Sequence, residues 1–166
     1  MSLSRTYRRL MLGLLLPLGL MGCAEIPERP HYKDGAPRQA QSLVLSASGE
    51  RLAVVNADTD SLSILDVTGT PRLLREIALA ERPQQDSAGR FEPRHGPRSV
   101  DLSPDGKLAY VACQWSGRLL VVDIEAGMVR REVVIGAEPV AVLVHPTGRA
   151  VYVSAYQSQE VVRLPL

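Results

Sequence analysis

One pattern recurs three times along the chain and limits its fold more than any other feature. In each occurrence a glycine ends a short polar turn, and a valine stands five residues later at the centre of an apolar run. The turn glycines are Gly49, Gly106 and Gly148, which stand 57 and then 42 residues apart. A recurring unit of this size is typical of folds that stack copies of one small motif.

Each unit divides into short strands separated by polar turns. One apolar strand precedes the glycine, a Val- and Tyr-rich strand follows it, and a third strand comes after a polar loop. The glycine supplies the positive φ that a tight hairpin needs. In the first two units a fourth segment, 73–77 and 129–135, alternates polar and apolar residues like a half-exposed outer strand. A single sheet of this kind cannot bury both faces, so neighbouring units are expected to stack.

The repeated motif resembles the YVTN-type β-propeller repeat, which is related in pattern to lactonase-type, surface-layer and haem d1 propellers. Ser103-Pro104-Asp105-Gly106 matches the family's turn fully, whereas 46–49 and 145–148 match it in part. The YVTN tetrad corresponds to 53–56, 110–113 and 152–155. The resemblance covers residues 41–166 and implies an all-β fold whose blades have four antiparallel strands. A repetitive β-sandwich is the alternative.

The repeats predict two full blades, at about 41–82 and 97–138, and part of a third at 139–166. A propeller closes with at least four blades. The sequence therefore predicts a truncated propeller, as the N-terminal part of a longer protein. An oligomer that shares blades is the alternative.

The N-terminal segment predicts export and lipidation. A positively charged start with Arg5, Arg8 and Arg9 precedes an apolar run at 10–20, which is too short to span a bilayer. The run ends in Leu20-Met21-Gly22-Cys23, which resembles the bacterial lipobox and implies a signal peptide at 1–22 with lipidation of Cys23. The alternatives are an ordinary signal peptide, an uncleaved anchor, or twin-Arg export through Arg8 and Arg9.

A lipid on Cys23 would make the membrane a partner and place the protein in the bacterial envelope. Ala24 is compatible with the outer membrane. Three prolines and a glycine in the segment 23–40 predict a flexible linker. The later Cys113 follows an apolar strand and is expected to be a structural thiol.

The longer first spacing locates an insertion at 83–96, predicted to be a loop on one rim of the propeller. It would bring Arg94 and His95 near Trp115 and Tyr156, with Arg98 beside them. These five residues are the candidates for receiving an anionic or aromatic ligand or a partner protein. A solvated surface loop without binding function is the alternative.

The remaining patterns predict neither a catalytic centre nor a cofactor. The three histidines, His31, His95 and His145, share no metal-ligand spacing, and His145 stands where a turn residue is expected. Asp58 and Asp60 lie close together, but two carboxylates are a weak calcium signal. A net charge of +1 gives no reason to expect nucleic-acid binding.

Two classes of function fit these observations. The first is a lipid-anchored propeller that binds an envelope protein or small ligand, or serves as a scaffold. The alternative is the N-terminal part of a propeller enzyme, lactonase-like or a haem- or cytochrome-linked oxidoreductase, whose active site needs residues beyond this chain.

Overall fold

The structure is a computed structural model that describes residues 42–80, 84–85, 87–89, 91–92 and 94–166. The predicted signal peptide, Cys23 and the linker lie outside the described residues, as do parts of the insertion. All described residues belong to one unit, Gly35–Leu166. The part of the chain that is described contains no helix with the length and apolarity that a bilayer crossing requires.

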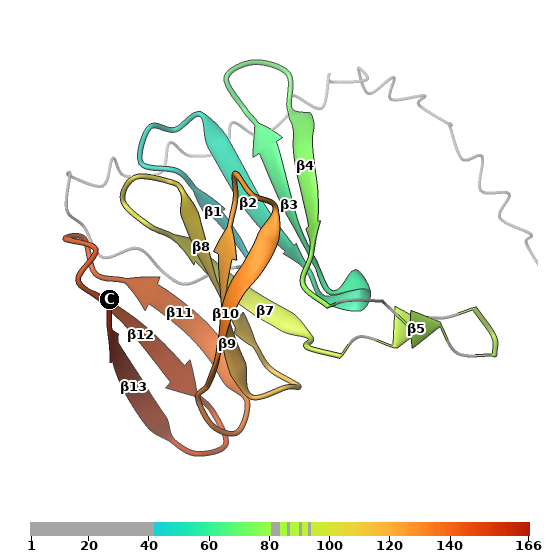
Figure 1. Cartoon of the computed structure of the whole chain (residues 1–166), viewed down its shortest axis with the longest axis vertical. Coiled ribbons are helices and arrows are strands. Elements are labelled where there is room, and N and C mark those ends of the chain that lie inside the picture. Colours follow the sequence, from blue (N-terminus) through green and yellow to red (C-terminus); the bar gives the residue numbers. More distant parts are fainter. Residues whose placement is uncertain (1–41, 81–83, 86, 90, 93) are drawn as a thin grey trace, which may run out of the picture. The chain divides into compact units, whose positions relative to one another are not determined.

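Three antiparallel sheets make up most of the described chain (Figure 1). Blade 1 has the strands β1 (Leu43–Leu45), β2 (Arg51–Asn56), β3 (Ser61–Asp66) and β4 (Arg72–Ala78). Blade 2 has β7 (Pro97–Leu102), β8 (Leu108–Cys113), β9 (Arg118–Asp123) and β10 (Met128–Val134). Blade 3 has β11 (Pro139–Val144), β12 (Ala150–Ala155) and β13 (Glu160–Pro165). The strands pair in chain order within each sheet, which confirms the predicted all-β fold with two four-stranded blades and part of a third.

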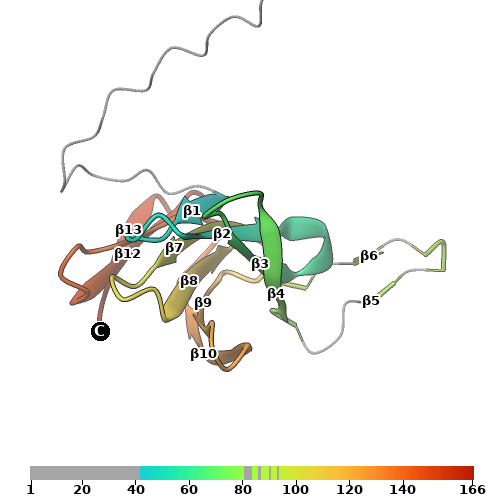
Figure 2. The ribbon, with the colours of Figure 1, turned by 90° about the horizontal axis from the view of Figure 1, so that it is seen from above.

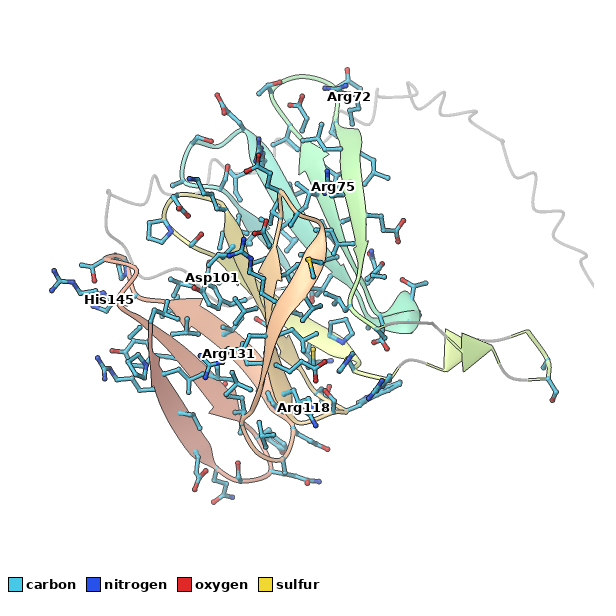
Figure 3. All side chains as sticks on the ribbon, in the orientation of Figure 1. Arg72, Arg75, Asp101, Arg118, Arg131 and His145 are labelled. Atoms are coloured by element: carbon cyan, nitrogen blue, oxygen red, sulfur yellow. The ribbon has the colours of Figure 1, made fainter. Side chains whose placement is uncertain are left out.

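The hairpins between the first two strands of each blade form for the reason that the sequence indicates. The turn glycines have φ values of 76°, 68° and 68° at Gly49, Gly106 and Gly148, in the left-handed region. A polar side chain closes each turn, and in blade 3 it is His145, whose Nδ1 accepts a bond of 3.2 Å from the Thr147 N–H (Figure 3). The prediction that His145 is a turn residue is confirmed.

The turns between the third and fourth strands are closed by aspartates. Asp66 accepts the Thr68 N–H at 3.0 Å, and Asp123 accepts the Ala126 N–H at 2.7 Å. The Thr68 N–H holds the pKa of Asp66 down at about 2, with the Thr68 hydroxyl and Arg72 adding to the effect. Both aspartates therefore cap turns by accepting bonds from the backbone.

The core lies between the blades. Alternate residues of β8 face opposite neighbours: Ala109, Val111 and Cys113 pack against blade 1, whereas Tyr110 and Ala112 pack against blade 3. Blade 2 thus contributes one face to each of two apolar clusters, as expected when side chains alternate along a strand. Seen from above, the three blades follow one another in chain order (Figure 2).

Cys113 is completely buried in the cluster between blades 1 and 2. Burial raises the pKa of its thiol far above the usual range, so the side chain is a neutral, apolar filler at neutral pH. This agrees with the predicted structural thiol.

Hydrogen bonds also join the inner strands of blades 2 and 3. The Asp101 carboxylate on β7 accepts the Val144 N–H of β11 at 2.7 Å, and the Ser99 hydroxyl accepts the Val142 N–H at 3.3 Å (Figure 3 labels Asp101). Asp101 and Ser99 are both buried. Because buried N–H groups need an acceptor, these side chains fix the register of one blade against the next.

The described part of the insertion contains regular structure where the sequence predicts a loop. It contains two short strands, β5 (Gln84–Gln85) and β6 (Phe91–Glu92), which pair as an antiparallel hairpin. The register pairs Gln84 with Glu92 and Gln85 with Phe91. The predicted inserted loop is therefore a hairpin in its described part.

The inter-blade core predicts a large contrast between two leucines. Leu119→Ala should lower the free energy of unfolding by about 2–5 kcal/mol, because Leu119 is fully buried between blades 2 and 3. Leu73→Ala, on the exposed surface of β4, is the matched control and should cost less than about 0.5 kcal/mol. Urea denaturation followed by circular dichroism measures both, and equal costs would contradict this account of the core.

Candidate functional site

One end of the blades carries the loops between second and third strands, at 57–60, 114–117 and 156–159. We call this end the loop rim, and the opposite end, with the glycine hairpins, the turn rim. The insertion also begins and ends at the loop rim, because it joins the outer strand of blade 1 to the inner strand of blade 2. The predicted site residues therefore have to be sought here.

Asp60 holds both ends of the insertion. Its backbone carbonyl accepts the Leu79 N–H at 2.7 Å, just before the insertion leaves blade 1. Its carboxylate accepts the N–H groups of Arg94, His95 and Gly96, the last two at 2.9 Å, where the chain returns. Three N–H donors on one buried carboxylate are charge-assisted bonds, which are about twice as strong as neutral ones. Asp60 thus makes a fixed base for the inserted hairpin. We call these contacts of Asp60 with Leu79, Arg94, His95 and Gly96 the Asp60 clamp.

The backbone places Asp60 for this role. Asp60 ends the short 3-10 helix Ala57–Thr59 and has a left-handed φ of 47°. The last residues of the other two rim loops, Gly117 and Gln159, are also left-handed, with φ of 68° and 55°. All three rim loops therefore end in a left-handed residue, and in blade 1 that residue carries a carboxylate next to the insertion.

His95 joins the end of the insertion to the rim loop of blade 2. Its carbonyl accepts the N–H groups of Trp115 and Ser116 at 3.1 and 3.3 Å, and its Nδ1 lies 3.1 Å from the Ser116 hydroxyl. The ring is buried. Burial lowers the pKa of His95, and the negative charge of Asp60 offsets this only in part, so the ring is neutral at pH 7.

Trp115 lies directly against Gly96. A Cβ atom at Gly96 would stand 2.7 Å from the indole ring, and its φ of +56° also favours glycine. The rest of the indole is exposed to solvent. A large exposed aromatic side chain on a fixed base is a common feature of binding surfaces.

The structure brings together three of the five residues that the sequence nominates. Arg94, His95 and Trp115 meet at the base of the insertion, with Arg94 exposed. Arg98 is also exposed, on β7, where its carbonyl accepts a bond of 3.2 Å from the Ser42 hydroxyl. Tyr156 is exposed on the rim loop of blade 3, one blade further on, where its N–H donates to the Glu138 carbonyl.

The buried position of His95 changes what each candidate can contribute. Arg94, Arg98, Trp115 and Tyr156 present side chains to solvent, whereas His95 lies inside the loop and orders it. Ligand binding by these residues stays a prediction.

Sequence reasoning missed Asp60 as the organising residue. It noted Asp60 with Asp58 as a weak calcium signal, but Asp58 is exposed and both oxygens of Asp60 accept backbone N–H groups. The signal available in the sequence was an aspartate at the end of the loop between the second and third strands of blade 1, the blade that the insertion follows. Within the described residues, no three His, Cys, Asp or Glu side chains gather as a metal site would require.

A concavity with a volume of about 600 Å³ lies at the turn rim, between blades 1 and 2. Its lining mixes basic and acidic side chains, including Arg51, Lys107 and Asp105. Arg75 is among them, and its guanidinium donates to the Glu125 carbonyl at 2.7 Å (Figure 3). The charges are balanced, so this groove gives no chemical preference for one class of ligand.

Comparison with solved structures shows the fold to be that of β-propeller proteins. The chain is similar to hydrazine synthase from Kuenenia stuttgartiensis (TM-score 0.55, 21% identity, 80% of this chain and 38% of that one). It is also similar to the periplasmic gluconolactonase of Pseudomonas aeruginosa (TM-score 0.58, 22% identity, 76% and 35%). The β-propeller domain of Cps50 (Swd1) from Myceliophteria thermophila gives a TM-score of 0.56 at 15% identity, over 71% of this chain and 35% of that one.

The chain thus spans little more than a third of the length of these propellers. No protein-family model matches it, and neither does any curated protein. At these identities the similarity establishes the fold and does not extend to activity.

The Asp60 contacts predict a local effect of substitution. Asp60→Ala leaves three backbone N–H groups without their acceptor, at a cost of about 1–3 kcal/mol. The amides of Arg94, His95 and Gly96 should then exchange with deuterium faster, as measured by NMR. Asp58→Ala is the matched control and should leave these three rates unchanged; equal rates in both variants would contradict the clamp.

Proposed function

We propose that this protein is a lipid-anchored β-propeller module of the bacterial envelope that binds a ligand or partner protein at its loop rim. The observation that carries the proposal is the Asp60 clamp, which fixes both ends of the inserted hairpin on blade 1. Binding elements held on a rigid base lose less conformational entropy when they engage a partner. A hairpin added to a regular repeat and fixed in this way is suited to recognition.

The exposed side chains around the clamp indicate the chemistry of the bound group. Arg94 and Arg98 offer guanidinium groups that can form paired hydrogen bonds with carboxylates or phosphates. Trp115 and Tyr156 offer aromatic surface. An anionic or aromatic ligand, or a protein surface with these groups, fits this combination.

The anchor rests on the sequence around Cys23. A lipobox-like segment after a short apolar run supports export and lipidation, and Ala24 supports the outer membrane. Bacterial lipoproteins carry more than one acyl chain, and stable membrane attachment needs more than one. The linker at 23–40 would separate the propeller from the membrane surface.

The alternative is that the chain is the N-terminal part of a propeller enzyme. Its fold is shared with a gluconolactonase and with hydrazine synthase, which is compatible with a lactonase-like or haem-linked oxidoreductase role. Such an activity would need residues beyond this chain. Hydrolysis of a sugar lactone by the full-length natural protein, lost on substitution of residues beyond Leu166, would favour this alternative.

Substitution at the loop rim tests the binding proposal. Arg94→Ala with Trp115→Ala, in the full-length protein, should weaken capture of envelope partners at least tenfold, because both exposed contacts are removed while Asp60 is retained. Arg72→Ala with Leu73→Ala, exposed on β4, is the matched control. Cross-linking in intact cells followed by mass spectrometry identifies the partners, and the same partners at the same yield in both variants would refute a rim site.

The anchor has its own test. Cys23→Ser should abolish incorporation of labelled palmitate and move the protein from the membrane fraction to the soluble envelope fraction. Cys113→Ser is the matched control and should change neither, because Cys113 is buried in the propeller. Unchanged labelling of the Cys23→Ser protein would contradict lipidation at this residue.

A further inference from the structure

The connection that carries the insertion is built differently from the connection between blades 2 and 3. The inner strands β7 and β11 begin at Pro97 and Pro139. His95 and Ala137, two residues before these prolines, therefore stand at equivalent positions. His95 is only 2% exposed, whereas Ala137 lies at the surface. A connection of this repeat thus forms without a buried histidine, and the burial of His95 is specific to the junction with the insertion.

His95 links the Asp60 clamp to the exposed indole of the loop rim. Its backbone N–H donates to the Asp60 carboxylate at 2.9 Å, and its backbone carbonyl accepts the Trp115 N–H at 3.1 Å. The ring Nδ1 lies 3.1 Å from the Ser116 hydroxyl. A movement of His95 therefore affects the clamp on one side and Trp115 on the other.

The charged groups that act on the His95 ring cancel one another. Asp60 of the blade 1 rim loop and Glu132 of β10 are negative. Arg94 at the end of the insertion and Arg118 of β9 are positive (Figure 3 labels Arg118). Both carboxylates already have partners, because Asp60 accepts three backbone N–H groups and Glu132 pairs with Arg118 at 3.2 Å. A proton added to the buried ring would gain no counter-ion of its own, and such a buried charge is costly.

The direction of the pH effect follows from the pKa of His95. Burial lowers this pKa below the ordinary value of about 6.5, and the charges of Asp60 and Glu132 offset the effect only in part. An opened rim, in which the ring meets water, therefore binds the proton more readily than the closed rim. Above about pH 6.5 the ring is neutral in both states, and pH has no effect. Below it, opening becomes easier by up to about tenfold per pH unit.

We propose that His95 is a pH-sensitive switch: the base of the insertion stays closed on blade 2 while the ring is neutral and opens when the ring is protonated. Opening separates the returning chain from Asp60 and frees Trp115 from Gly96, against which the indole packs. Histidine is the side chain whose charge ordinarily changes in this pH range. The loop rim then releases its ligand or partner in acid, a consequence that rests on the proposed function.

The free, full chain tests the switch without any variant. Trp115 is the single tryptophan, and its fluorescence should change in one transition with a midpoint below about pH 6.5. The NMR signals of the His95 ring should titrate with the same midpoint. The amides of His95 and Gly96 should open up to about tenfold more often per pH unit, after correction for the intrinsic pH dependence of exchange. A ring that titrates while Trp115 fluorescence and amide opening stay constant would overturn the proposal.

Substitution separates the proton from the shape of the site. His95→Asn keeps a hydrogen-bonding atom toward Ser116 but has no group that titrates in this range, so the Trp115 transition should disappear. His145→Asn is the matched control, because His145 lies in a hairpin turn at the opposite rim, and it should leave the transition in place. The same transition in His95→Asn, or its loss in His145→Asn, would overturn the switch.

These readouts distinguish the switch from the proposed function, because they need no partner. Failure of the partner-capture test at Arg94 and Trp115 would refute rim binding, while the acid transition of the free chain would remain. A Trp115 signal that stays constant through the titration of His95 would refute the switch, while partner capture at neutral pH would remain.

Discussion

The apolar contact between neighbouring blades is the interaction on which the rest of the structure depends. A strand in a single four-stranded sheet has two faces, and β8 uses both: Val111 packs toward blade 1 and Tyr110 toward blade 3. No blade can bury both faces within itself. The repeat is therefore stable only when its blades are stacked.

Stacking also explains where a functional site can be added. The inner strands are held in register by side chains such as Asp101, so the repeat tolerates little change there. The connections between blades are less constrained, and the insertion occupies one of them. After the insertion, the Asp60 carboxylate fixes the position of the returning chain by accepting the backbone N–H groups of Arg94, His95 and Gly96. The same contacts that hold the fold together give the inserted hairpin a fixed base, on which the proposed binding role rests.

Much of the fold could be predicted from the sequence, because alternating apolar residues and turn glycines act locally. Gly106 and its two counterparts locate the hairpins, and Asp66 and Asp123 close turns within a few residues of themselves. The site could be predicted only in part. Asp60 binds residues more than 30 positions later in the chain, and no local pattern indicates which loop it meets. His95 is buried because the chain returns against blade 2, which is also a contact between distant parts of the sequence. The lowered pKa of His95 follows from this burial and could not be predicted from the sequence.

The mutual dependence of the blades is tested most directly by comparing two probes in one urea titration. Trp115 is the single tryptophan, so its fluorescence reports on blade 2, whereas circular dichroism reports on all strands. Leu62→Ala removes a buried side chain from blade 1. If the blades are stabilised by one another, both probes should follow a single transition that shifts equally in the variant. A Trp115 transition that stays in place while the circular dichroism transition shifts would contradict the account.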